Sequence, residues 1–286
     1  MSIRNALLNT RRIASGPMRR LQVQRLAARG CAPLYCLFYH RVADTHPNDW
    51  TISCDRFAQH IDYMRSQFEM IGLDELQRRV RQKDSHRPAI AITFDDGYAE
   101  NSRFALPLLM QHKIPCTYFV STQHVLTGRP FGHDQAAGVP LPVNTVEELR
   151  AAAEGGVEIG LHTRTHVDLA GVDDADVLQR EITDAVPELA DLIGRRIRYF
   201  AFPYGLPQQI TQAGVQAVYD AGLEGFCSAF GAYNLPGRDA YHIRRIHGDP
   251  DFSRLRNWLE FDSRKLKIEP ELRYSLPAPP QPIAPK

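Results

Sequence analysis

The residues most suggestive of chemistry are Asp95 and Asp96, two adjacent carboxylates that follow a short apolar run. The run Ala89–Phe94 is typical of a strand buried on both faces, and Gly97 directly after the two acids lets the backbone turn. Carboxylates at the end of a buried strand are costly unless a cation or hydrogen-bond donors meet them. The pair therefore indicates a cation or catalytic site, and the plainer alternative is that it caps the helix that follows.

A second apolar run, 157–161, ends before His162, and His166 follows four residues later. Two histidines at this spacing are by themselves weak evidence for a site. Together with Asp96, however, they form a set of two imidazoles and one carboxylate, which is typical of a catalytic metal site with positions left for water. We therefore predict that Asp96, His162 and His166 bind one divalent metal, with Zn²⁺ favoured and Co²⁺ or Ni²⁺ also compatible.

Three motifs of the chain resemble those of the polysaccharide deacetylases, the NodB-homology family of carbohydrate-esterase type. They are TFDDG at 93–97, HTRTH at 162–166 and FAFPYG at 200–205. The similarity runs from about residue 33 to about residue 259 and so covers most of the chain.

The resemblance assigns a role to each matching residue. It implies that Asp95 is the general base and that Asp96 and the two histidines bind the metal. It also implies that the backbone amide of Tyr204 stabilises an oxyanion, while Pro203 fixes the turn. The third motif departs from the family pattern, because Ala201 stands where an arginine usually begins it.

Arg245, in the stretch HIRRIH, is the candidate to replace that missing arginine by pairing with Asp95. Arg244 is an equally good candidate from the sequence, and a solvated surface arginine is the alternative. The sequence thus predicts a supporting cation for the base without deciding which arginine supplies it.

A hydrolysis of this kind needs a general acid to protonate the leaving amine. The stretch YHRV at 39–42 resembles the start of a subgroup whose motif order is circularly shifted, so that the acid comes first. We therefore predict that His40 is the acid. His247 is the competing candidate because it lies late in the domain, and His40 as a buried structural histidine is the plain alternative.

The order of predicted elements indicates how these residues come together. Strand-like and helix-like segments alternate, which predicts a parallel sheet or barrel. Apolar runs end at His40, Asp96, His162 and Tyr204, and the carboxyl ends of parallel strands lie on one rim. We predict an α/β fold with a single distorted (β/α) barrel of about seven parallel strands, the number being taken from the resemblance.

Several other segments have expected structures. The long segment 123–144, with Phe131, His133 and Asp134, is predicted to be a loop that forms part of the substrate-facing wall. Periodicity and helix breakers predict three further elements, namely a helix over 98–112 interrupted at Pro107, a helix over 173–193 and a strand over 241–246.

Composition divides the 286-residue chain into three parts. Residues 1–30 hold seven arginines and no acidic residue, which is compatible with a basic amphipathic segment on an anionic membrane or with a helix packed over the barrel. Residues 31–262 form the predicted deacetylase-like barrel. Residues 263–286 form a Pro-rich tail, which we expect to be extended or disordered from Pro270 onward.

Charge and cysteine content narrow the function classes. The net charge of +1 gives no reason to expect nucleic acid as a partner. The five cysteines are scattered, without a disulfide or zinc-ribbon spacing, and indicate a reducing compartment. With no apolar run typical of a signal peptide or a membrane span, we expect a cytoplasmic protein, with the inner face of the membrane as a possible contact.

The candidate metal site and the resemblance to polysaccharide deacetylases together imply a metal-dependent hydrolase that removes an N-acetyl group from an amino sugar. The substrate would be a glycan or a lipid-linked glycan precursor, as in exopolysaccharide or cell-envelope biosynthesis. A carbohydrate O-esterase and a deformylase of a lipid-linked amino sugar would use the same site. A non-catalytic glycan-binding module is a weaker alternative, since such a module would lose a metal ligand or the base.

Overall fold

The computed structural model describes residues 3–277, and within 3–9 it describes the backbone only. The described residues form one nine-stranded, all-parallel sheet with the strand order β10-β9-β8-β7-β6-β5-β1-β11, and β4 pairs beside β5. The strands of this sheet are β1 (Leu34–Tyr39), β4 (Glu69–Met70), β5 (Ala89–Phe94), β6 (Cys116–Val120), β7 (Glu158–Leu161), β8 (Tyr199–Ala201), β9 (Gly225–Cys227), β10 (His242–Ile243) and β11 (Ile246–His247).

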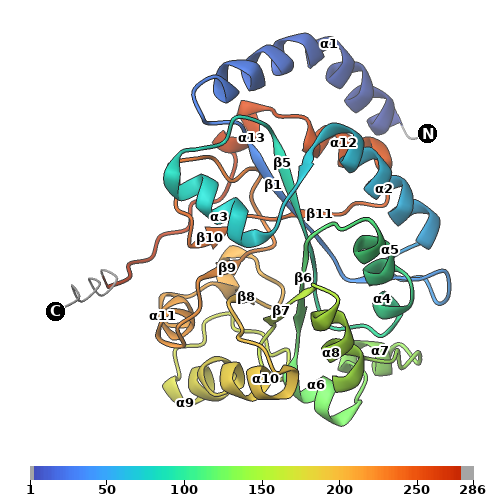
Figure 1. The fold of residues 1–286 in the computed structure, drawn as a ribbon, viewed down its shortest axis with the longest axis vertical. Coiled ribbons are helices and arrows are strands. Elements are labelled where there is room, and N and C mark those ends of the chain that lie inside the picture. Colours follow the sequence, from blue (N-terminus) through green and yellow to red (C-terminus); the bar gives the residue numbers. More distant parts are fainter. Residues whose placement is uncertain (1–2, 278–286) are drawn as a thin grey trace.

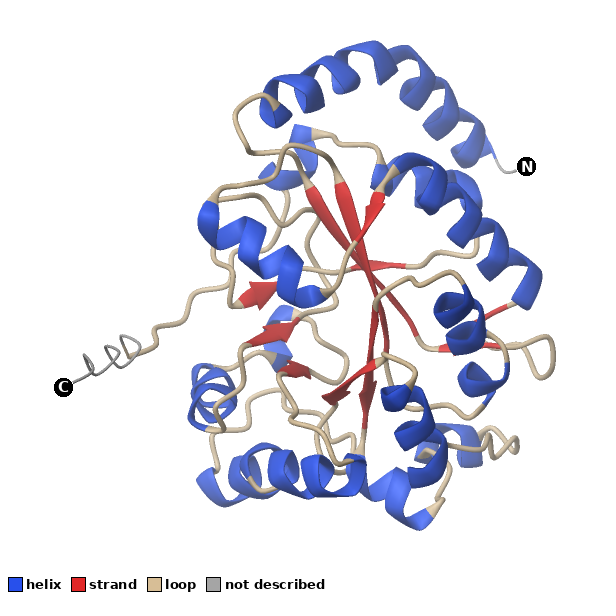
Figure 2. Cartoon of the chain, in the orientation of Figure 1, coloured by secondary structure: helices blue, strands red, loops and turns tan. Residues whose placement is uncertain are grey.

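Helices surround the strands (Figure 2). They are α1 (Ile3–Ala27), α2 (Cys54–Gln67), α3 (Leu73–Gln82), α4 (Glu100–Arg103), α5 (Ala105–Gln111), α6 (Thr122–Thr127), α7 (Gly132–Ala136), α8 (Val146–Glu154), α9 (Ala175–Leu178), α10 (Ala185–Ile193), α11 (Gln212–Asp220), α12 (Phe252–Leu259) and α13 (Ser263–Lys267). A separate pair of short strands, β2 (Arg41–Val42) and β3 (Thr51–Ile52), lies in the loop after β1.

The two ends of the sheet are joined by a single extended segment. β10 pairs with β9, and β11, two residues later, pairs with β1. The strand predicted over 241–246 is therefore split between two partners, because the chain crosses from one edge of the sheet to the other. β10 and β11 together lie between β9 and β1, and the curled sheet forms a distorted barrel, the fold that the sequence predicts.

The alternation of side chains along each strand creates two apolar layers. In β1, Leu34 and Cys36 face the barrel interior together with residues of β5, β6, β8 and β9, whereas Tyr35 and Leu37 face the surrounding helices. Helix α3 covers the amino-terminal end of the interior with apolar residues. Its buried Gln77 donates hydrogen bonds to two carbonyls of the barrel loops, at 3.0 and 2.8 Å. The opposite, carboxyl-terminal end is left for the candidate site.

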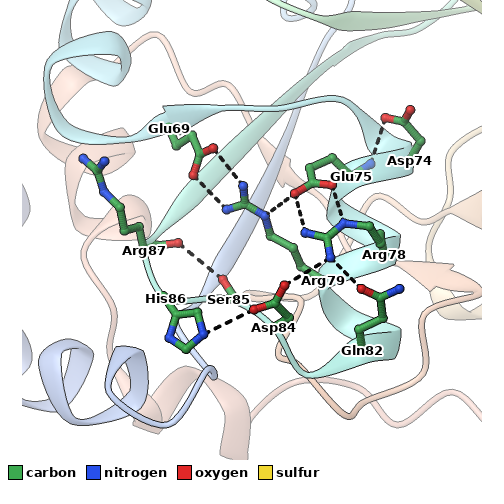
Figure 3. Close-up of polar contacts among 10 residues, drawn as sticks. All are labelled: Glu69, Asp74, Glu75, Arg78, Arg79, Gln82, Asp84, Ser85, His86 and Arg87. Atoms are coloured by element: carbon green, nitrogen blue, oxygen red, sulfur yellow. Dashed lines mark hydrogen bonds and ion pairs between the residues drawn. The ribbon is translucent and has the colours of Figure 1, made fainter.

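Ion pairs hold α3 in this position (Figure 3). Arg79 contacts Glu69 of β4 at 2.8 Å and Glu75 of its own helix at 2.7 Å. Arg78 contacts Glu75 at 2.6 Å and Asp84, in the segment that leads to β5, at 3.1 Å. Partly exposed ion pairs contribute little stability one by one. Together they fix the orientation of α3 against the strands that it covers.

Helix α1 lies across α12 at one side of the barrel (Figure 1). Arg12 pairs with Glu260 at 2.6 Å, and the buried Arg19 lies 3.2 Å from Asp262. These contacts favour the packed-helix alternative for residues 1–30. A membrane contact through this segment stays a prediction. No helix among residues 3–277 is long and apolar enough to cross a bilayer.

Deleting residues 1–30 is expected to lower the melting temperature, because the deletion leaves Asp262 and Glu260 without Arg19 and Arg12 and uncovers part of α12. Calorimetry of the full chain and of the truncated chain measures this.

The same pair of proteins tests the membrane contact. Binding to anionic vesicles that weakens with salt and is lost in the truncated chain would support it, whereas equal binding would leave packing as the role of α1.

Three predicted elements differ in detail from the structure. The helix over 98–112 breaks at Phe104, and Pro107 lies in the first turn of α5, where its missing N–H is not needed. The segment 123–144 is only partly a loop, since it contains most of α6 and all of α7. The helical run between Ala175 and Ile193 contains a π-turn at its centre.

The beginning of the Pro-rich tail is attached to the barrel. After α13 the described residues have no regular secondary structure, which agrees with the predicted extended chain. The buried Glu269 pairs with Arg244 and Arg238, and Ser275 exchanges hydrogen bonds with Gln212. Residues 278–286 of the predicted tail lie outside the described residues.

Candidate metal and catalytic site

Strand ends bring the candidate residues to one cavity of about 440 Å³ at the carboxyl-terminal end of the barrel. β1, β5, β7 and β8 each end directly before a residue of its wall. A larger cavity of about 630 Å³ lies at the amino-terminal end, around the start of β6 and β7, and contains none of the candidate residues. The smaller cavity is lined by Phe38, His40, Asp49, Trp50, Asp95, Asp96, His133, His162, His166, Phe202, Tyr204, Leu206, Ala229 and His247.

Asp96, His162 and His166 converge as the sequence predicts. One ligand atom from each lies within 4.8 Å of the other two. Oδ1 of Asp96 is 3.4 Å from Nε2 of His162 and 3.2 Å from Nε2 of His166. Nδ1 of His162 lies 2.7 Å from the carbonyl oxygen of Ala201, so its N–H donates there and Nε2 faces Asp96.

The unsatisfied groups at this point fit a cation. Oδ1 of Asp96 is buried and has no hydrogen-bond partner among the described residues. An orphaned carboxylate oxygen beside two imidazole nitrogens is costly in a protein interior, and a divalent metal would satisfy all three atoms. The donor set of two nitrogens and one oxygen suits Zn²⁺ and related ions.

The protonation states of the site also favour the binding of a cation. Burial alone would raise the pKa of Asp96, but the imidazoles of His162 and His166 hold it well below its usual value. Burial would lower the pKa of His166, yet Asp96, with Asp95 and Asp168, more than offsets this and raises it. The carboxylate therefore stays ionised, and His166 binds a proton more readily than a free histidine does. Because a metal-binding imidazole must be neutral, metal binding here should release a proton from His166.

Backbone strain is concentrated around the site. Asp96, Thr163, His166 and Tyr204 have positive φ angles of 75°, 58°, 59° and 59°. This left-handed region is unfavourable for residues other than glycine, and such strain clusters at functional sites. Gly97 follows with a φ of 98°, and a Cβ there would lie 3.3 Å from a side chain of β6. The turn after β5 thus requires a glycine in order to present the two carboxylates.

Asp95 lies beside the metal ligands and is held by Arg245. Nη1 and Nη2 of Arg245 donate to the two carboxylate oxygens at 2.7 and 2.9 Å. The buried guanidinium also donates to Oγ1 of Thr93 at 3.1 Å and to the carbonyl of Ser228 at 2.8 Å. Burial alone would raise the pKa of Asp95, but Arg245, His162 and His40 together outweigh burial and the pKa is lowered. Asp95 is therefore ionised and oriented at neutral pH, as a general base must be.

The structure thus distinguishes the two arginines of HIRRIH. Arg245 makes the contact with Asp95, and Arg244 pairs instead with Glu269 of the C-terminal segment. They are adjacent residues of an extended segment, so their side chains point to opposite sides. Only Arg245 points into the barrel.

His40 and His247 both line the cavity, with ring centroids 6.4 Å apart. Nδ1 of His40 is buried and has no hydrogen-bond partner among the described residues. Burial lowers the pKa of His40, although the carboxylates of Asp96 and Asp95 oppose this effect. His247 at the end of β11 is more exposed. The cavity therefore accommodates either histidine as the acid, and the assignment to His40 stays a prediction.

Pro203 and Tyr204 form the turn after β8. The side chain of Tyr204 is 56% exposed, and its ring lies 5.6 Å from the ring of His166. The amide of Gly205 donates to the carbonyl of Pro203, whereas the amide of Tyr204 has no backbone acceptor among the described residues. An amide without an acceptor in a residue that lines this cavity suits an oxyanion. The oxyanion role stays a prediction.

The family model for polysaccharide deacetylases matches residues 82–225, which is half of the chain. The chain belongs to the polysaccharide deacetylase family. The matched range includes the two carboxylates, the two histidines of HTRTH and the third motif. His40 and Arg245 lie outside it.

Individual proteins show the same likeness. YxkH of Bacillus subtilis (strain 168), which is named for this family, is 24% identical over 195 residues, and the match covers 67% of this chain and 64% of YxkH. IcaB from Ammonifex degensii is 25% identical, with a TM-score of 0.66 over 80% of this chain and 97% of that chain. A de-N-acetylase from Aggregatibacter actinomycetemcomitans is 19% identical and shares the fold, with a TM-score of 0.65 over 79% and 99% of the two chains. These findings confirm the family and the fold that the motifs predict.

Sequence reasoning missed part of the cavity wall. Trp50 and Asp49, from the loop between β2 and β3, line the cavity, and the Trp50 ring lies 5.8 Å from that of His40. His133 of α7 also lines it, in agreement with the wall predicted for 123–144. A tryptophan in a polar stretch soon after the strand that ends before His40 is the signal in the sequence that could have pointed to this loop.

Replacing His162 or His166 by Ala is expected to abolish stoichiometric metal binding, because each change removes one of three protein ligands. Elemental analysis of the dialysed variants measures this, with His124→Ala, on α6 outside the cavity, as the control. Stoichiometric metal in both ligand variants would mean that the cation binds elsewhere.

Proposed function

We propose that this protein is a metal-dependent hydrolase that removes an N-acetyl group from an amino sugar of a glycan or a lipid-linked glycan precursor. The observation that carries the proposal is the contact between Asp95 and Arg245 beside the cluster of Asp96, His162 and His166. An ionised, oriented carboxylate next to a divalent metal site is what metal-assisted amide hydrolysis requires.

Each residue has a part in the proposed reaction. A divalent metal held by Asp96, His162 and His166 would lower the pKa of water and polarise the acetamide carbonyl. Asp95 accepts the proton of the attacking water as its oxygen bonds to the carbonyl carbon. The amide of Tyr204 donates a hydrogen bond to the oxygen that becomes negative.

The second half of the reaction breaks the C–N bond. His40 donates a proton to the nitrogen as this bond breaks, which releases acetate and the free amine of the sugar. The proton that Asp95 took up then leaves to solvent or returns through His40. Arg245 keeps the Asp95 carboxylate in one orientation throughout.

The cavity wall supports a sugar substrate. Trp50 and Tyr204 are large, exposed aromatic residues at its edge, and such side chains contact the apolar faces of ligands while nearby polar groups orient them. A carbohydrate O-esterase or a deformylase of a lipid-linked amino sugar would place its acyl group at the same metal site. These activities differ from the proposed one only in the substrate.

Acetate release from a panel of substrates tests the proposal. The panel comprises N-acetylated oligosaccharides, a lipid-linked N-acetylamino sugar, the corresponding N-formyl compound and an O-acetylated xylo-oligosaccharide. Release of acetate and of a free amine from an N-acetylated member, sensitive to a chelator, is the expected result. Preference for the ester or the formamide would replace deacetylation by one of the alternatives, and no turnover of any member would leave glycan binding alone.

A further inference from the structure

The helical run after the HTRTH loop is not regular. Between α9 and α10, residues Gln179–Thr183 form a π-turn, and the amide of Asp184 donates to the carbonyl of Gln179 at 2.8 Å. π-turns are rare and often occur at functional sites, because the wider turn re-aims a side chain. The apolar periodicity of this segment alone predicts an uninterrupted helix.

The π-turn carries Glu181, a carboxylate that is only 3% exposed and lies against the HTRTH loop. Its Oε2 accepts hydrogen bonds from the amide and from the hydroxyl of Thr165, both at 2.9 Å. Its own carbonyl oxygen accepts a hydrogen bond from the amide of Arg164, also at 2.9 Å. One residue thus satisfies three donors of the loop between the two metal-ligating histidines.

The opposite side of the loop is also fixed. The hydroxyl of Ser121 donates to the carbonyl of His162 at 2.7 Å, and the amide of Gln123 donates to the carbonyl of Arg164 at 2.9 Å. The loop therefore lies between the start of α6 and the π-turn. Its left-handed residues, Thr163 and His166, need such support because their backbone conformation is unfavourable.

The two histidines differ in how their rings are oriented. The ring of His162 is oriented directly by its hydrogen bond to Ala201. Among the described residues, no carbonyl or carboxylate outside the metal cluster accepts a hydrogen bond from the ring of His166. The ring of His166 packs against the rings of Phe131 and Tyr204, at 5.2 and 5.6 Å. Its backbone is held by Glu181 through the preceding residue, Thr165.

We propose that Glu181 is a positioning residue of the metal site, which sets metal affinity by holding Thr165 and, through it, His166. The inference rests on the proposed metal-dependent function. Residues that orient a metal ligand typically change metal affinity or activity by about 10- to 100-fold when they are replaced. A buried carboxylate that accepts two hydrogen bonds from one residue is well suited to this role.

The chain offers a matched control on the same helical run. Glu188 also contacts the HTRTH loop, but only through the side chain of Arg164, at 3.1 Å, and it is partly exposed. Glu188→Gln removes a carboxylate close to the loop without touching the backbone around His166. It is expected to leave metal affinity unchanged.

Titration of the apoprotein with Zn²⁺ against a chromophoric chelator tests the inference, with the melting temperature of each apo variant measured in parallel. We expect the Kd for Zn²⁺ to rise about 10- to 100-fold in Glu181→Ala and less in the isosteric Glu181→Gln. The visible spectrum of the Co²⁺-loaded variants should also change, because the geometry of the His166 ligand changes.

The outcomes separate the inference from the proposed function. If the unaltered protein binds no Zn²⁺, the proposed metal site itself is wrong. If the unaltered protein binds Zn²⁺ and both Glu181 variants keep the same Kd and Co²⁺ spectrum, the inference is overturned, even where their melting temperatures fall. Should Glu181→Ala fail to fold, Glu181→Gln and Thr165→Val, which removes one donor to the carboxylate, decide the question by the same two readouts.

Discussion

Replacing Asp95 by Asn is expected to lower turnover by about 10²- to 10⁴-fold while the protein keeps its metal. Asn preserves the size of the side chain but cannot accept a proton from water. Asp95 contacts Arg245 rather than the imidazoles, so its loss leaves Asp96, His162 and His166 in place. Initial rates of acetate release, measured beside the metal content of the same sample, give both quantities.

The neighbouring change provides the contrast. Asp96→Asn replaces the carboxylate oxygen that lies 3.4 and 3.2 Å from the two imidazoles, and it is expected to weaken metal binding. Excess metal should restore part of the activity of this variant but none of the activity of Asp95→Asn. Equal loss of metal in the two variants would show that the roles of the two carboxylates are not divided as proposed.

Replacing His40 by Ala is expected to cause the second large effect, a loss of turnover of about 10²- to 10⁴-fold with metal and fold retained. His40 has the buried, unpartnered Nδ1 and lines the cavity together with both carboxylates, whereas His247 is more exposed. His247→Ala is therefore expected to have a mild effect. The reverse pattern would assign the acid to His247.

The pH dependence offers an independent check on His40. An acid must carry its proton, so its contribution is present below its pKa and is lost as the pH rises through that value. Burial lowers the pKa of His40. In the free protein, the activity that depends on this proton should therefore decline at a pH below the usual titration range of histidine. The kcat/KM profile should thus fall on its alkaline side, and His40→Ala should lack that fall. A variant that keeps the same alkaline fall would show that another group causes it.

The parts of the site that the sequence predicts are those encoded in contiguous motifs. An apolar run that ends in Asp95 and Asp96, and another that ends in His162, imply a shared rim because parallel strands bring their carboxyl ends together. The choice between Arg244 and Arg245 could not be made in the same way. It depends on which side chain of a two-residue crossing between β10 and β11 faces inward, and both have the same chemistry.

Other features depend on contacts that no local pattern encodes. Trp50 reaches the cavity through the fold of the loop between β2 and β3, which has no periodicity of its own. The apolar periodicity around Glu181 is compatible with a regular helix, so it gives no sign of the π-turn that carries this residue. For α1 the composition was compatible with two environments, and the buried Arg19 beside Asp262 favours packing on the barrel.

Hydrolysis by this protein should depend on a metal held by Asp96, His162 and His166. The most direct test measures metal content and acetate release on the same sample as purified, after chelation, and after reconstitution with Zn²⁺, Co²⁺ or Ni²⁺. We predict about one metal per chain, loss of acetate release with the metal, and recovery on reconstitution in the unaltered protein but not in His162→Ala. Full acetate release from protein shown to be metal-free would contradict the account.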